Sequence, residues 1–256
     1  MNATFFESSL SVVKSFMKNK TLLFFALLFC IQSGNAQKLQ LFVTSYSGVS
    51  VFKNNNHDNF TDMYNNPYSE PYVYSWHPYG KTPRFSWGAE GQMTFAAKKG
   101  LLFNLSAGYE ELTSTIGIDT IYSYGFITNI YRAEGRTTNR AAFITIFPSL
   151  GYRLKAKKIN IDMNAGIVVA ACLSSREKGR AAATSGSFKL QSDRKTDHPS
   201  SDIRPSLQAM LHYKKLALVA GYQWGLKNYY KQLTGANPQP EAFSRFLKLG
   251  ISYRVQ

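Results

Sequence analysis

The stretch LALVAGYQWGL, residues 216–226, decides the fold because its side chains alternate between two kinds. One set of alternate positions, which includes Leu216, Tyr222 and Trp224, is mostly large and apolar. The other set, which includes Gly221 and Gln223, is small or polar. A period of two residues is that of a β-strand with two different faces. The first face suits lipid, and the second suits a narrow interior.

The same alternation recurs in other segments of about ten residues, the length of a membrane-crossing strand. Together with the first stretch, which lies next to last in the chain, they make eight, and the most N-terminal one is less regular. We therefore predict an all-β fold, an eight-stranded antiparallel up-and-down transmembrane β-barrel. The additional segments are 40–52, 85–95, 101–110, 142–152, 159–171, 206–213 and 247–255.

The connections between these segments alternate between short and long. Tight basic turns are expected at 97–100, 155–158 and 214–215. Short periplasmic turns on one rim and long extracellular loops on the other are typical of outer-membrane barrels. The predicted long loops are 53–84, 112–139, 174–202 and 230–242.

The N-terminal segment has the three parts of a secretory signal peptide. Lys18 and Lys20 precede an apolar run from Leu22 to Ile31, and cleavage is expected after Ala36. The apolar run is shorter than the roughly 20 residues of a spanning helix. We therefore expect 1–36 to be an N-terminal extension and cleaved signal peptide with its true start at Met17, and 37–256 to be the barrel domain.

The net charge and the cysteine content limit which kinds of molecule the chain is expected to bind. The formal net charge is +15, and loss of a leader with three lysines and one glutamate leaves +13. The basic residues fall in turns and loops rather than along one helix, so nucleic acid is not expected as a partner. Outer-membrane lipids and lipopolysaccharide are expected instead. Cys30 lies in the leader, which leaves Cys172 without a disulfide partner or a zinc motif.

A soluble β-sandwich or lipocalin-like barrel also consists of short strands and hairpins. Such folds expose a charged face to water, whereas the second face here is rich in Gly, Ser, Ala, Asn and Gln. That composition favours a filled lumen inside a membrane barrel.

Several motifs resemble the porin-like outer-membrane β-barrel family of Bacteroidota. They are the leader end Asn35-Ala36-Gln37, the stretch FPSLGY at 147–152 before a basic turn, and the final strand LKLGISYRV at 247–255. The resemblance implies location in the cell outer membrane and insertion by the barrel assembly machinery. Closing strands of this family usually end in an aromatic residue, whereas this chain ends Val255-Gln256, with Tyr253 the nearest outward aromatic.

Charged side chains on the small or polar face are candidates for a lumen network, since eight strands leave room only for packed side chains. An ion-pair network that fills the barrel is favoured, and a narrow ion or proton path is the alternative. The candidates are Glu90, Glu110, Arg153, Asp162, His212 and Lys248.

The first loop is rich in Tyr, Trp and Asn, as binding surfaces are, and the third is strongly basic. An aromatic girdle and a solvated loop are the ordinary interpretations. The candidate contact residues are Tyr72, Tyr74, Trp76, Tyr79, Arg176 and Arg180.

No catalytic constellation, cofactor motif or metal-ligand spacing is present in the sequence. The leading hypothesis is therefore a non-enzymatic outer-membrane barrel with a structural or surface-interaction role. The alternative is a small porin-like channel for ions or compact solutes. Phe143, Phe147 and Val168 share the inward parity, and they argue against an open lumen.

Overall fold

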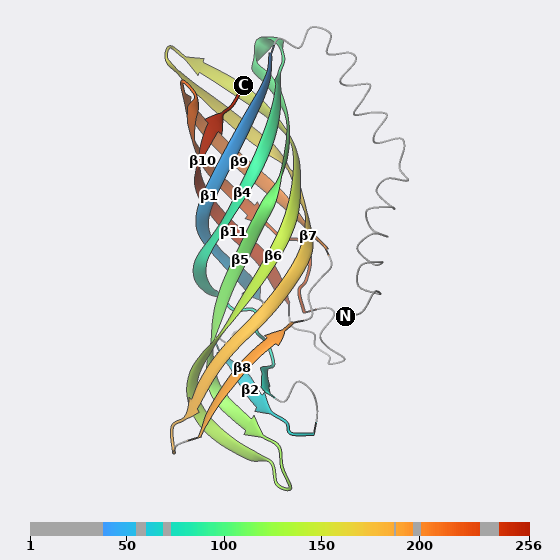
Figure 1. Cartoon of the computed structure of the whole chain (residues 1–256), viewed down its shortest axis with the longest axis vertical. Coiled ribbons are helices and arrows are strands. Elements are labelled where there is room, and N and C mark those ends of the chain that lie inside the picture. Colours follow the sequence, from blue (N-terminus) through green and yellow to red (C-terminus); the bar gives the residue numbers. More distant parts are fainter. Residues whose placement is uncertain (1–37, 55–59, 69–72, 187, 197–200, 231–240) are drawn as a thin grey trace, which may run out of the picture.

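The computed structural model describes residues 38–54, 60–68, 73–186, 188–196, 201–230 and 241–256. The predicted leader, 1–36, lies outside the described residues. Eight strands form a closed ring, which confirms the predicted fold class (Figure 1). They are β1 (Lys38–Asn54), β4 (Thr82–Ala96), β5 (Leu101–Ser123), β6 (Asn129–Ala156), β7 (Ile159–Ala183), β9 (Ser201–Tyr213), β10 (Leu216–Trp224) and β11 (Ala242–Arg254).

Every neighbouring pair in the ring is antiparallel, and the first strand pairs with the last. The register Gly48↔Lys248 between β1 and β11 closes the barrel. A closed ring leaves no unpaired backbone edge, which is the condition for a β-structure to cross a bilayer.

The rim with the short connections, which we call the turn rim, contains the three tight turns predicted from the sequence. The pairs Ala156↔Ile159 and Tyr213↔Leu216 each enclose a two-residue turn of lysines. Lys157 and Lys214 adopt positive φ angles of 44° and 54°, which match the twist of the flanking strands. The C-terminus lies at the same rim, as an even strand number requires (Figure 1).

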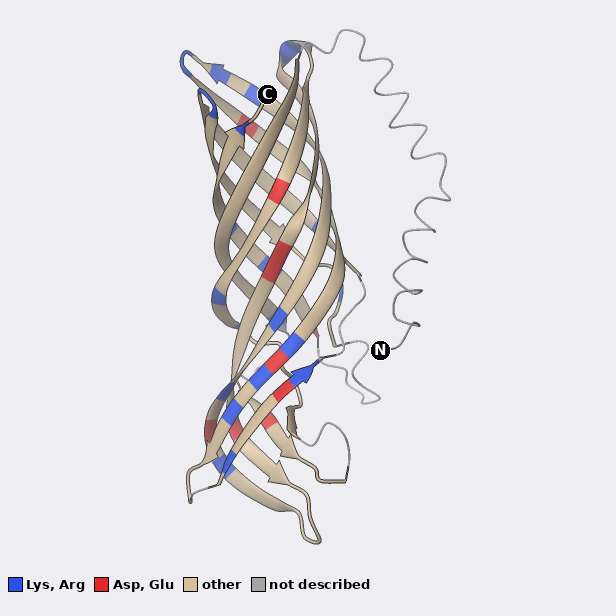
Figure 2. Ribbon diagram, in the orientation of Figure 1, with Lys and Arg blue, Asp and Glu red and all other residues tan. Residues whose placement is uncertain are grey.

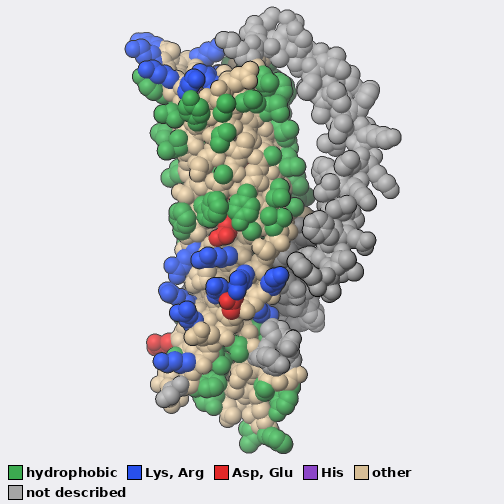
Figure 3. Space-filling model, viewed as in Figure 1, with side chains coloured by type: hydrophobic (Ala, Val, Ile, Leu, Met, Phe, Trp, Pro, Cys, Tyr) green, Lys and Arg blue, Asp and Glu red, His purple; other side chains and the backbone are tan. Residues whose placement is uncertain are grey.

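Inward and outward side chains alternate along every strand of the ring. Large apolar residues cover the outside of the barrel, as the green surface of Figure 3 shows. Outward aromatic residues border this apolar band on both sides, as in outer-membrane barrels. They are Tyr152, Tyr213 and Tyr253 toward the turn rim, and Trp87, Tyr109, Tyr222 and Trp224 toward the other rim.

The second and third long loops differ from the prediction, because most of their residues are strand. β5 and β6 continue as a hairpin that turns at 124–128, and β7 runs to Ala183 and pairs with β8 (Lys189–Lys195). Inward and outward side chains still alternate here. Outward positions such as Arg136 and Thr138 are polar, however, so the alternation of apolar with polar residues that predicts a strand is lost. The strands β5, β6 and β7 therefore extend well beyond the rest of the ring (Figure 1).

The part of the structure beyond the apolar band, which contains the β5–β6 hairpin, the end of β7 and β8, is called the extension below. The first long loop adds two further strands to it. β2 (Phe60–Asn65) pairs in parallel with β5, and β3 (Val73–Ser75) pairs with β2. The extension has its own small hydrophobic core, separate from the barrel interior. Its buried members are Met63, Ile118, Ile121, Ala133, Ala181 and Leu190.

Candidate functional site

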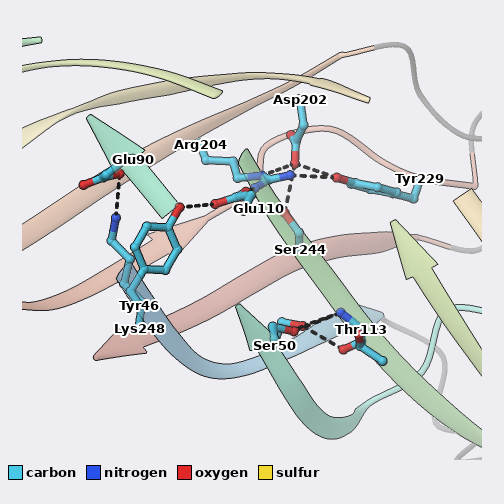
Figure 4. Close-up of polar contacts among 11 residues, drawn as sticks. Tyr46, Ser50, Glu90, Glu110, Thr113, Asp202, Arg204, Tyr229, Ser244 and Lys248 are labelled. Atoms are coloured by element: carbon cyan, nitrogen blue, oxygen red, sulfur yellow. Dashed lines mark hydrogen bonds and ion pairs between the residues drawn. The ribbon is translucent and has the colours of Figure 1, made fainter. Parts of the chain in front are cut away.

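An ion-pair cluster of buried side chains occupies the barrel interior (Figure 4). The Arg204 guanidinium pairs with Glu110 through Nη1 and donates to Asp202 Oδ2 through Nε at 2.7 Å. All three side chains are at most 1% exposed. Tyr229 and Ser244 each donate a hydroxyl hydrogen bond of 2.9 Å to the same oxygen of Asp202. The arginine therefore lies between two buried carboxylates that come from β5 and β9.

A second buried pair continues the cluster along the barrel axis. Lys248 Nζ lies 3.5 Å from Glu90 Oε2 and 4.3 Å from the centre of the Tyr46 ring. The Tyr46 hydroxyl in turn donates to Glu110 Oε2 at 3.4 Å. Its ring covers Gly88, where a Cβ atom would come within 2.5 Å of the ring carbons. The contacts thus run without a break from Glu90 to the Arg204 cluster.

A third group lies nearer the turn rim. Arg153 makes a bidentate pair with Asp162, with both N–H···O distances at 2.7 Å, and donates to Gln40 Oε1 at 2.9 Å. His212 Nε2 lies 2.8 Å from Asp162 Oδ2, and the His212 ring packs against Phe42. Planar bidentate geometry is the strong form of this ion pair, so the group orders the interior at this level.

Aromatic side chains close the loop-side mouth of the barrel. The rings of Phe52, Tyr79 and Tyr229 lie 4.8–5.3 Å apart, and all three are fully buried. The Tyr230 hydroxyl donates to the Tyr79 carbonyl at 3.0 Å. Gly80 follows, and a Cβ atom there would come within 2.0 Å of the Thr115 carbonyl oxygen, so only glycine allows this close approach.

Serine hydroxyls hydrogen-bond to the backbone where the β4–β5 register shifts between Pro83 and Trp87. The Thr113 amide donates to Ser86 Oγ at 2.9 Å and to Ser50 Oγ at 3.0 Å. Ser50 in turn donates to the Thr113 carbonyl at 2.7 Å (Figure 4). These bonds satisfy backbone groups that would otherwise be buried without partners.

The structure places the six lumen candidates in the barrel interior and divides them into two clusters. Arg153, Asp162 and His212 meet near the turn rim, while Glu90, Glu110 and Lys248 belong to the central cluster.

Sequence reasoning missed Asp202, Arg204 and Tyr229. Asp202 ends the predicted third loop, and Arg204 lies between that loop and the predicted strand 206–213, which begins directly after Pro205. A proline within a run reads against a strand. The signal that could have found them is parity, since Asp202 and Arg204 share the inward face with Ser206.

The predicted contact residues of the first loop lie in different environments. Tyr72 lies outside the described residues. Tyr74 is half-buried and Trp76 is 42% exposed. The expectation for Tyr79 is wrong, because its ring packs in the closed mouth and is fully buried.

The basic candidates lie on the outer surface of β7. Arg176 and Arg180 are both exposed. Arg176 pairs with Asp193 at 2.6 Å, and this hydrogen bond holds the pKa of the Asp193 carboxyl below its usual range.

Tyr64 is the centre of an aromatic cluster on the extension. Its ring stacks on Tyr122 at 4.9 Å and on Tyr74 at 5.3 Å, with interplanar angles of 9° and 12°. Arg194 lies 5.0 Å from the centre of the Tyr74 ring. Partial burial raises the pKa of the Tyr64 hydroxyl, and the nearby Asp62 adds to the shift.

In the described part of the chain, no helix has the length and hydropathy that a membrane-spanning helix needs. Across the same residues, no cluster of three or more His, Cys, Asp or Glu side chains could hold a metal ion.

No family model and no curated protein matches this chain. Among solved structures, Neisserial surface protein A is similar at 10% identity, covering 85% of this chain and 99% of its own, with a TM-score of 0.36. Ail of Yersinia pestis, solved with the heparin analogue sucrose octasulfate, is 10% identical over 84% and 97%, with a TM-score of 0.33. The N-terminal barrel domain of Pseudomonas aeruginosa OprF is 9% identical over 85% and 99%, with a TM-score of 0.26. At these values the likeness carries no information about ligand or activity.

The closed ring, the apolar outer band and the two aromatic borders identify the chain as an outer-membrane β-barrel protein.

Replacement of Arg204 tests the central cluster. Arg204→Met leaves the Glu110 and Asp202 carboxylates buried without their cation, which should lower the free energy of unfolding by about 3–5 kcal/mol. Arg176→Met breaks an exposed pair and should change the free energy of unfolding far less than Arg204→Met does. The triple variant Glu110→Gln, Asp202→Asn, Arg204→Met should recover much of the loss. Reversible urea unfolding in phosphocholine vesicles measures all three, and similar losses for the two single variants would contradict the assignment.

Proposed function

We propose that this chain is a non-conducting, non-enzymatic outer-membrane barrel that presents a β-structured contact surface at the cell exterior. The observation that carries the proposal is the filled interior. Between the Arg153 group and the closed mouth, buried side chains are linked by ion pairs, hydrogen bonds and ring contacts. Eight strands leave an interior just wide enough for side chains to fill.

A small channel is the competing function, and it requires a continuous polar path. Phe143 and Phe147, at 0% and 3% exposure, lie in the interior on β6, and Val168 on the neighbouring β7 belongs to the same buried cluster. The Arg204 guanidinium rests 4.4 Å from the centre of the Phe143 ring. An ion would have to displace these contacts, so the interior favours a structural role over transport.

The extension supplies the proposed contact surface. Its Tyr64 cluster is only partly buried, and rigid aromatic side chains are common at binding surfaces. The hairpin between β5 and β6 adds Phe126, Ile127 and Ile130, which are 107%, 75% and 65% exposed. Such a contiguous exposed apolar group marks an interaction site more often than a solvated surface.

The buried Glu177 carboxylate keeps this surface rigid. It accepts hydrogen bonds from the Ser75 amide at 2.8 Å and from the Ser192 hydroxyl at 2.9 Å, and it pairs with Arg194 at 2.9 Å. These contacts tie β3, β7 and β8 together. A rigid surface loses little conformational entropy on binding.

The remaining parts of the proposal rest on sequence patterns. Membership of the porin-like family of Bacteroidota rests on the FPSLGY stretch and the final strand, which would also be the segment used by the barrel assembly machinery. We propose no catalytic role, because His212 is held between Asp162 and Phe42.

Planar-bilayer recording tests the closed interior. The refolded mature chain, with heat-modifiable gel mobility as proof of a barrel, should give no discrete current steps. Glu90→Gln and Lys248→Met variants that still fold provide the comparison. Steps in the unmodified chain that change in these variants would make the protein a pore.

Cysteine labelling tests the orientation. In a Cys172→Ala background, Lys189→Cys on β8 should react with a large membrane-impermeant maleimide on intact cells. Lys158→Cys on the turn rim should react only after the outer membrane is permeabilised. Labelling of the turn-rim cysteine on intact cells would reverse the orientation and remove the proposed surface role.

A further inference from the structure

The outer surface of β6, β7 and β8 contains basic side chains in an arrangement that repels itself. Arg136 lies directly opposite Arg180, and Arg140 lies directly opposite Arg176. Arg176 has Lys195 directly opposite on its other side. Like charges directly opposite each other destabilise a sheet. We call this surface the basic face; its members are Arg136, Arg140, Arg176, Lys178, Arg180 and Lys195.

The acidic residues near this face do not neutralise it. Asp193 pairs with Arg176 at 2.6 Å and with Lys178 at 3.8 Å, while Glu134 and Glu111 lie at its edges. Within the part of the chain that the structure describes, Arg136, Arg140 and Arg180 form no ion pair. Six cations therefore face three carboxylates, and an external anion would relieve the repulsion.

The surface is hollowed at this place, with a depression of about 690 Å³. Five of the six basic side chains line it, together with the hydroxyl-bearing Thr138 and Ser174 and the acidic Glu111 and Asp193. This size is in the range of small-ligand sites. Guanidinium and hydroxyl groups are the donors that proteins use for phosphate, and paired arginines can hold one phosphate between them.

The height of the basic face relative to the membrane indicates which anion it meets. Ile144 and Ile146, outward on β6, are 50% and 49% exposed and belong to the apolar band. Arg140 lies four residues before Ile144, toward the loop-side end of β6, which is about 13 Å at the rise of a β-strand. With the usual strand tilt this is about 10 Å along the membrane normal, which places Arg140 at the outer edge of the headgroup layer, since headgroups add about 5–8 Å on each side of the hydrocarbon core. Figure 3 shows the basic residues directly beyond the apolar band.

We propose that the basic face binds the phosphorylated headgroup of an outer-leaflet glycolipid, of the lipopolysaccharide class. Its acyl chains would lie against the apolar band. Its phosphates would reach the Arg136/Arg180 and Arg140/Arg176 pairs, which lie four residues apart along β6. A disaccharide with a phosphate at either end offers two anionic groups for two arginine pairs. The inference rests on the proposed outward orientation of the extension.

Basic residues follow β7 and β8 in Figure 2, and a second group marks the turn rim at the opposite end of the barrel. The turn rim therefore provides a matched control. Lys155, Lys158 and Lys215 are exposed like the members of the basic face, but they lie in or beside two-residue turns rather than directly opposite one another.

Native mass spectrometry of the refolded mature chain in an uncharged detergent tests the proposal, with bisphosphorylated lipid A as the probe. The unmodified chain should retain lipid A and should not retain its dephosphorylated form. Arg136→Gln/Arg140→Gln/Arg180→Gln should weaken retention by at least about tenfold, since charge-assisted phosphate contacts are lost. Lys155→Gln/Lys158→Gln/Lys215→Gln removes the same charge and should change retention less than about twofold. Heat-modifiable mobility must be unchanged in both variants.

Two results would overturn the proposal. Equal losses in the two triple variants would mean that net charge alone attracts the lipid. A soluble sulfated oligosaccharide that displaces lipid A and binds as tightly would make the face a site for a free polyanion. Neither result would affect the closed interior, because conductance tests that claim separately.

Discussion

The Arg204 side chain is buried in the barrel interior, and its guanidinium is balanced by Glu110 on one side and Asp202 on the other. A buried charge of this kind is tolerated only when its partners are held in place. The strands that supply them are therefore fixed in register with one another. Tyr229 and Ser244 complete the Asp202 shell and bring the β10–β11 connection and β11 into the same arrangement. The rest of the interior is built around this contact.

Contacts of the Arg204 cluster extend in both directions along the barrel. Toward the turn rim, Tyr46 links Glu110 to the Lys248–Glu90 pair. Toward the loops, Tyr229 is shared between the ion cluster and the aromatic closure with Phe52. The filled interior is the basis for our proposal that the function lies on the outside of the molecule. There the β-strands pass from a lipid-facing surface to a basic surface and end in an aromatic one.

The eight strands and the lumen positions could be predicted because a period of two survives in any strand, whatever its neighbours are. The hairpin extensions could not be predicted from apolar alternation, since their outward positions, such as Arg136, Thr138 and Arg140, face water or headgroups. Arg204 was not predicted for a different reason, because the predicted strand 206–213 begins two residues after it, directly after Pro205. Cross-strand partners such as Glu110 and Arg204 are 94 residues apart, and no local pattern pairs them.

The most direct test of the sealed interior is the exchange of the Arg204 Nε hydrogen with water, observed by NMR of the folded chain in lipid nanodiscs. The Arg176 Nε hydrogen, which also pairs with a carboxylate but lies at the surface, is the internal reference. The account predicts that the Arg204 hydrogen exchanges far more slowly than that of Arg176. Exchange at the same rate for both would show that water passes through the barrel, and it would contradict the closed interior.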